Sequence, residues 1–331
     1  MKIIQSMALF LATSCGCAIA DDWQSPVEAE LENSKPAIYE EYKQARTLID
    51  GYRGNPADMQ QAHQLLIGVQ KKDRNQAPVL RELGRLYIIA AHFGGDRFDQ
   101  RTLKVAEDSI LHSISIAPKY EDAYVLLGHL YTKSRQYQKA TDALDQATTL
   151  GSNSPWLKLN LAEVYVKTKR YDDALSLVQE VLERGTSNTK AETTAYTQKI
   201  NIHWALGSLD AVKQAHQDLL SAQADEAQHW GNYASFLLYA FSDTDGAITA
   251  AEKALSILDY QDARLTMAVA LYTQWAHIAE DAAREDEAAQ IYDKATSSFP
   301  DYAQVIKVAS RNAATKEVAS KLAAYLELKT K

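Results

Sequence analysis

The chain has 331 residues, a net charge of −8 and a hydrophobic content of 46%, which is ordinary for a folded globular protein. It contains 13 glycines and 7 prolines, and Ala, Leu, Gln, Glu and Lys are prominent, so the composition predicts an all-α fold. The acidic balance argues against nucleic acid as the main ligand, because phosphate binding needs a basic surface.

Residues 1–20, "MKIIQSMALFLATSCGCAIA", have the pattern of a secretory signal peptide. Lys2 precedes a short apolar run, and "AIA" offers a cleavage site after Ala20. We therefore expect an exported protein, in the first place a periplasmic one. The alternatives are an uncleaved anchor, for which the apolar run is short, and a membrane-anchored lipoprotein modified at Cys15 or Cys17. With both cysteines in this segment, the mature chain is predicted to form no disulfide.

Residues 21–35 contain few apolar side chains and are predicted to be a mobile acidic lead. A helix is expected from Pro36 to Asp50. It is followed by the second half of a helix pair, whose core positions are Ala62, Leu66 and Val69.

The segment "LGHLYTKSRQYQKATDAL", residues 127–144, repeats itself along the chain. A shift of 34 residues pairs Leu127 with Leu161, Gly128 with Ala162, Tyr131 with Tyr165, Tyr137 with Tyr171, Ala140 with Ala174 and Leu144 with Val178. A fixed period of this length predicts a solenoid of helix pairs. Spacings of three and four residues place Leu127, Gly128 and Tyr131 on one helical face, so Gly128 is predicted to mark a close helix crossing.

The same pattern is found on both sides of this segment. Before it, a copy at residues 83–116 carries ten extra residues, assigned to a loop-like insertion at Gly94–Leu103. After it come a degenerate copy at Thr189–Leu220 and two clearer copies at 230–258 and 267–300. The predicted organisation is a solenoid of about six repeats over residues 36–312, closed by a capping helix at 313–331.

These positions resemble the tetratricopeptide repeat family, which has Leu-Gly-x-x-Tyr in a first helix and Tyr-x-x-Ala-x-x-x-Leu-x-x-Ala in a second. The resemblance is strongest at Glu121–Arg184, and it departs from the pattern at Val181 and at the insertion. It implies a right-handed α-solenoid whose first helices line a concave groove that binds a peptide or helix of a partner protein.

The groove residues implied by the resemblance lie beside the core stripe of each first helix. They are Arg81, Arg85, Ile88, Val125, His129, Lys133, Trp156, Leu159, Asn160, Glu163, Val166, Lys167, Asn232, Ser235 and Leu238. Leu126 and Trp156 stand where some family members place polar residues that clamp a terminal carboxylate, so that activity is not implied. The apolar surplus of these helices has two interpretations, an apolar partner groove or tight packing within the superhelix.

No cofactor is implied by the sequence, and no metal site, since the eight histidines form no ligand motif. The sequence also contains no nucleophile motif and no phosphate-binding motif. We expect a non-catalytic interaction scaffold of the cell envelope. The alternatives are a self-associating structural subunit, which would be a homo-oligomer, and an enzyme or small-ligand binder with a deep polar pocket.

Overall fold

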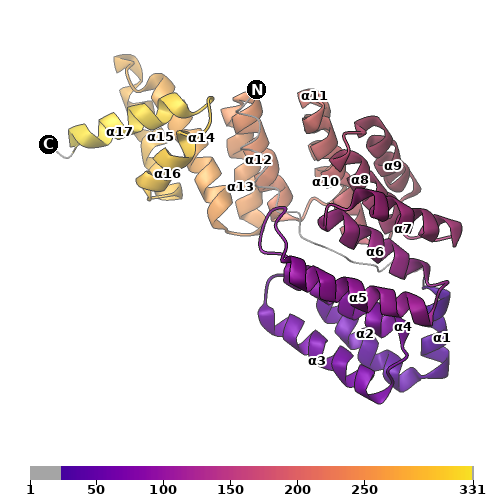
Figure 1. Cartoon of the computed structure of the whole chain (residues 1–331). Helices are drawn as coiled ribbons and strands as arrows, with labels where there is room; N and C mark the ends of the chain where they lie inside the picture. Colours follow the sequence, from indigo (N-terminus) through magenta and orange to yellow (C-terminus); the bar gives the residue numbers. More distant parts are fainter. Residues whose placement is uncertain (1–23, 330–331) are drawn as a thin grey trace. The chain divides into compact units, whose positions relative to one another are not determined.

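The computed structural model describes residues 24–329, which form α-helices, a 3-10 turn at Ala282–Arg284 and an isolated β-bridge between His92 and Phe98. Helices account for the fold, as the composition predicts. The described residues group into two compact units, 24–206 and 207–329, which we call the N-terminal unit and the C-terminal unit. Figure 1 shows the helices of both units in chain order.

The N-terminal unit contains ten helices. They are α1 (Pro26–Ser34), α2 (Pro36–Asp50), α3 (Pro56–Lys72), α4 (Ala77–Ala91), α5 (Gln100–Ile116), α6 (Glu121–Lys133), α7 (Tyr137–Thr149), α8 (Pro155–Lys167), α9 (Tyr171–Arg184) and α10 (Thr189–Ala205). The helix expected at Pro36–Asp50 is confirmed.

Seven further helices build the C-terminal unit. They are α11 (Leu209–Ala222), α12 (Ala227–Phe241), α13 (Thr244–Ile257), α14 (Gln261–Ile278), α15 (Glu285–Ser298), α16 (Tyr302–Ala309) and α17 (Lys316–Lys329). α17 occupies the place of the predicted capping helix and packs against α14 and α16. The degenerate copy at Thr189–Leu220 is also helical, as α10 and α11, but its two helices belong to different units.

The packing of the N-terminal unit distinguishes an inner from an outer layer. Each of the first helices α2, α4, α6 and α8 contacts the next first helix, and the series ends at α10. The helices α3, α5, α7 and α9 contact the first helices before and after them. In a solenoid, the helices that approach one another most closely form the inside of the curve. We call the surface made by α2, α4, α6, α8 and α10 the inner face.

Glycines permit the close contact within two of the helix pairs. A Cβ atom placed on Gly128 would lie 2.5 Å from Cγ of Leu144, and one on Gly84 would collide with Ile110. No Cβ approaches another carbon so closely in a relaxed structure. The prediction that Gly128 marks a close helix crossing is confirmed.

The segment predicted to be a mobile lead is instead partly helical. α1 spans Pro26–Ser34, and its Glu28 and Leu31 are buried. Ser25 followed by Pro26 is a helix-start signal that the low apolar content obscured. The insertion also differs slightly, because the loop lies between Ala91 and Gln100, where the Asp99 side chain accepts a hydrogen bond from the backbone N–H of Thr102 and caps α5.

The signal peptide, with Cys15 and Cys17, lies outside the described residues. Among residues 24–329, no helix combines the length and apolar character needed to cross a membrane.

Candidate functional site

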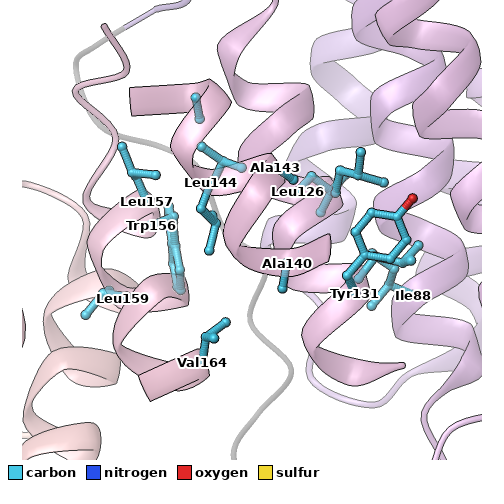
Figure 2. Close-up of a cluster of buried hydrophobic side chains, with 14 of the residues drawn as sticks. Ile88, Leu126, Tyr131, Ala140, Ala143, Leu144, Trp156, Leu157, Leu159 and Val164 are labelled. Atoms are coloured by element: carbon cyan, nitrogen blue, oxygen red, sulfur yellow. The ribbon is translucent and has the colours of Figure 1, made fainter. Parts of the chain in front are cut away.

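Most residues predicted to line an open groove are buried. Arg81, Arg85, Val125 and Leu159 are at most 1% exposed, and Trp156 is 6% exposed. The reason is that neighbouring first helices touch one another, so side chains beside the core stripe pack between repeats. Ile88, Trp156 and Leu159 are part of one hydrophobic cluster, shown in Figure 2. In the described structure these side chains are packed rather than exposed, which agrees with the tight-packing interpretation.

Four of the predicted polar residues come together between α6 and α8. Nδ1 of His129 lies 3.2 Å from Oδ1 of Asn160, whose Nδ2 donates to the carbonyl oxygen of Val125 at 3.3 Å. Nζ of Lys133 donates to Glu163 at 2.6 Å. These contacts join α6 to α8, so the four side chains connect adjacent repeats.

Val166 and Lys167 lie near the C-terminal end of α8 and are not fully buried. Val166 is partly buried, and Lys167 donates to Asp96 of the insertion loop at 2.6 Å. Because both partners of this ion pair are partly exposed, it contributes at most about 1 kcal/mol. In the C-terminal unit, Leu238 is buried, and the predicted Asn232 and Ser235 are partly buried.

The inner face binds Glu28 of α1, an acidic side chain that the repeat pattern does not predict. Its Oε1 accepts hydrogen bonds from the hydroxyls of Tyr42 at 2.8 Å and Tyr120 at 2.7 Å. Its Oε2 accepts from Nη1 of Arg46 at 2.7 Å. Glu28 is only 2% exposed. Helix α2 and the residue preceding α6 thus hold a carboxylate with three donors, which we call the Glu28 pocket.

Electrostatics favour the ionised form of Glu28. Burial alone would raise the pKa of Glu28, but the charges of Arg46 and Arg81, with the two tyrosine hydrogen bonds, outweigh it and keep the pKa below its usual value. Burial raises the pKa of Tyr42 and of Tyr120, and the negative charge of Glu28 raises both further. Both phenols therefore stay protonated and act as donors.

A buried charged network lies beside the Glu28 pocket. Arg81 and Arg85 both pair with Glu82, and Arg85 also pairs with Asp50. Nε and Nη2 of Arg81 and both carboxylate oxygens of Asp122 have no hydrogen-bond partner. Burial raises the pKa of Asp122 to about 7, against the opposing charge of Arg81. Such unpaired buried groups are costly, which makes this region a candidate for function.

Further unpartnered polar atoms follow on the next first helices. They are Nε2 of His129 on α6, Nε1 of Trp156 on α8 and Oε1 of Gln198 on α10. Trp156 can donate and Gln198 can accept. A polypeptide backbone offers both N–H and C=O groups, so it could pair with them where the inner face opens enough to expose these buried atoms. We call His129, Trp156 and Gln198 the polar row.

Two further features of the described residues concern metal binding and small-ligand binding. Among residues 24–329, no group of three or more His, Cys, Asp or Glu side chains is arranged to hold a metal ion. In the C-terminal unit an open, shallow depression is lined by Leu255, Asp259, Arg264, Met267, Lys294, Ser297 and Ser298. Arg264 there is paired with Asp259, so its charge is already compensated.

Comparisons with known proteins agree with the fold. Residues 131–194 match the tetratricopeptide repeat family model. No curated protein matches the chain. Among solved structures, one from the APC/C hetero-tetramer Cut9–Hcn1 aligns with a TM-score of 0.53 and 15% identity, covering 74% of this chain and 45% of that one. The chain thus spans less than half of that relative.

Two other structures align over more of the chain. Yeast Tom70 gives a TM-score of 0.51 at 13% identity, over 99% of this chain and 70% of that one. The apo form of the quorum sensor NprR from B. thuringiensis gives a TM-score of 0.51 at 14% identity, over 90% of this chain and 92% of that one. At these identities the likeness shows the fold, an all-α tetratricopeptide-type solenoid, and fold does not by itself determine function.

Proposed function

We propose that this protein is a non-catalytic scaffold that binds a segment of a partner protein along the inner face of its N-terminal unit. The observation that supports this most is the polar row, in which three consecutive first helices each carry a buried polar atom without a partner. Because these atoms are buried, a bound polypeptide backbone would supply the missing hydrogen bonds only after the side chains that cover them move aside. The repeat fold and the family match at 131–194 agree with an interaction role.

A conservative substitution in the polar row tests this proposal. Trp156→Phe removes the Nε1 donor but retains an aromatic ring. The smaller ring in the hydrophobic cluster should lower the melting temperature moderately while the chain stays folded. Affinity for the partner should fall by about three- to tenfold, the value of one hydrogen bond. The partner would first be captured from fractionated cell extract with the unaltered chain and identified by mass spectrometry.

Trp230→Phe is the matched control. Trp230 lies on α12 in the C-terminal unit, and its Nε1 donates to the carbonyl oxygen of Ala224 at 2.8 Å. Partner affinity should be unchanged in this variant. Equal affinities for the Trp156 and Trp230 variants, with cross-links to the partner mapping away from the inner face, would refute the proposed site.

We also propose that the scaffold acts in the cell envelope, as the signal-like residues 1–20 suggest. A mature N-terminus at Asp21 and recovery from the periplasmic fraction would support this. A lipid-modified Cys15 or Cys17 would instead identify a membrane-anchored lipoprotein. The mass of the purified chain by light scattering distinguishes a monomeric scaffold from a self-associating subunit.

A further inference from the structure

Helix α1 is attached to the inner face through polar contacts as well as through its apolar side chains Val27 and Leu31. Its buried side chains are Glu28 and Leu31, and the preceding Ser25 donates to Glu121 at 3.3 Å. These three residues, Ser25, Glu28 and Leu31, are spaced by three, so they lie on one side of the helix. α1 contacts the first helices α2 and α4, which are labelled beside it in Figure 1. A short helix is thus already docked where a partner segment is proposed to bind.

The connection to α2 makes α1 a separable element. Lys35 joins the two helices with φ −143° and ψ 62°, and Pro36 occupies the first turn of α2. A residue before proline is disfavoured in the helical region, so α1 and α2 do not merge into one helix. With 9 residues, α1 is also too short to be a stable helix in isolation. It depends on the surface that it covers.

The surface under α1 remains a carboxylate site when α1 leaves. Tyr42 and Tyr120 would each retain a hydroxyl donor without its acceptor, and the charge of Arg46 would lose its closest partner at 2.7 Å. Arg81 nearby already has two guanidinium nitrogens, Nε and Nη2, without a hydrogen-bond partner. Two phenols and two guanidinium groups around one space select an anionic side chain. Leu31 lies in the adjoining hydrophobic cluster with Tyr42 and Ile49.

We propose that α1 is an intramolecular ligand of the inner face, and that the partner displaces it with a helix carrying a glutamate and a leucine in the pattern Ser-x-x-Glu-x-x-Leu. This rests on the proposed function and specifies the chemistry of its ligand. The tether through Lys35 gives α1 a high effective concentration, so a competing segment must bind additional sites. The polar row on α6, α8 and α10 provides such sites. α1 therefore restricts binding to partner segments that are long enough to reach both the Glu28 pocket and the polar row.

The test uses the full chain and a fluorescein-labelled peptide with the sequence of Gln24–Ser34. Glu28→Gln in the chain weakens the internal ligand, so the peptide should bind this variant at least about tenfold more tightly than the unaltered chain. Glu30→Gln is the matched control, since Glu30 lies on the exposed side of the same helix. It should bind the peptide as the unaltered chain does. A second peptide with glutamine at the Glu28 position should bind the Glu28→Gln chain at least about tenfold more weakly than the first.

Hydrogen exchange of the same variants distinguishes a docked ligand from a part of the core. In Glu28→Gln, the α1 amides should exchange at least about tenfold faster, while the amides of α6 to α9 keep their protection. Loss of protection throughout the N-terminal unit would show that α1 is an integral part of the core and overturn the proposal. So would equal peptide affinity for the three chains. If partner capture still depends on Trp156 in that case, the scaffold function stands and the internal ligand alone is refuted.

Discussion

Two buried carboxylates on the inner face show how neighbouring groups determine whether a buried carboxyl group is ionised. Glu28 receives three hydrogen bonds and has a lowered pKa. Asp122, 1% exposed, has no hydrogen-bond partner on either oxygen, and burial raises its pKa to about 7. The folded state therefore favours a charged Glu28 and a protonated Asp122.

The Asp122→Asn variant should be more stable than the unaltered chain at pH 8. Between the ordinary aspartate pKa near 4 and the folded value near 7, the folded state binds more protons, so raising the pH destabilises the unaltered chain. Asparagine does not ionise, so the variant does not lose this stability as the pH rises. The gain in free energy of unfolding should be at least about 1 kcal/mol larger at pH 8 than at pH 5. Asp145→Asn, at an exposed site on α7, is the control and should show no such difference. Denaturant titrations at both pH values measure it.

Two glycines within helices should respond oppositely to the same substitution. Gly128→Leu overpacks the contact with Leu144 and should cost about 1–3 kcal/mol or more, which exceeds the gain of about 1 kcal/mol from replacing a helical glycine. A Cβ on Gly68 of α3 meets no atom within 4 Å, so Gly68→Leu should stabilise by up to about 1 kcal/mol. Thermal melts that move in the same direction would contradict this account of the repeat.

At the scale of elements, helices that belong to the repeat pattern are easier to predict from the sequence than helices outside it. Gly128 and Leu144 meet within one helix pair, so their spacing recurs along the chain and predicts the fold. Helix α1 has no copy, and its polar contacts reach residues far along the chain, so periodicity could not reveal it. The burial of Arg81 and Leu159 was also not predictable, because spacing indicates which face a residue shares but not how tightly successive first helices approach.

The packing of α11 on α12 should make the C-terminal unit sensitive to acid. His216 of α11 is 4% exposed and stacks on Phe236 with ring centroids 5.1 Å apart. Burial, with a smaller contribution from His229, lowers the pKa of His216 to about 4. The unfolded state then binds more protons below about pH 6.5, so stability is lost as the pH falls towards 4.

Substituting His216→Phe should remove most of that loss. Relative to the unaltered chain, the variant should gain about 3 kcal/mol in free energy of unfolding on going from pH 7 to pH 4, the equivalent of the lowered pKa. Urea titrations of both chains at the two pH values provide the comparison. A stability difference that does not depend on pH would show that His216 binds a proton equally well in the folded and unfolded states, and would contradict the lowered pKa.

For the whole molecule, the sequence predicts one solenoid over 36–312, whereas the described chain forms two compact units divided after Leu206. Units with separate cores can unfold separately. We expect calorimetry to resolve two transitions. Gly128→Leu should lower only one of them, and His216→Phe should alter the pH dependence of the other. A single transition that shifts in both variants would show that the units unfold cooperatively.

The contacts of α1 also bear on the order in which the chain folds. Glu28 bonds to Tyr120 across 92 residues, and Ser25 bonds to Glu121 across 96, whereas the repeats pair helices that are adjacent in sequence. Closing so long a loop is slower than forming local contacts. During synthesis or refolding, α2 to α5 can assemble before α1 has a complete binding surface. The inner face should therefore pass through a transient state in which it is open to other chains, and a partner present at that moment meets no internal competitor.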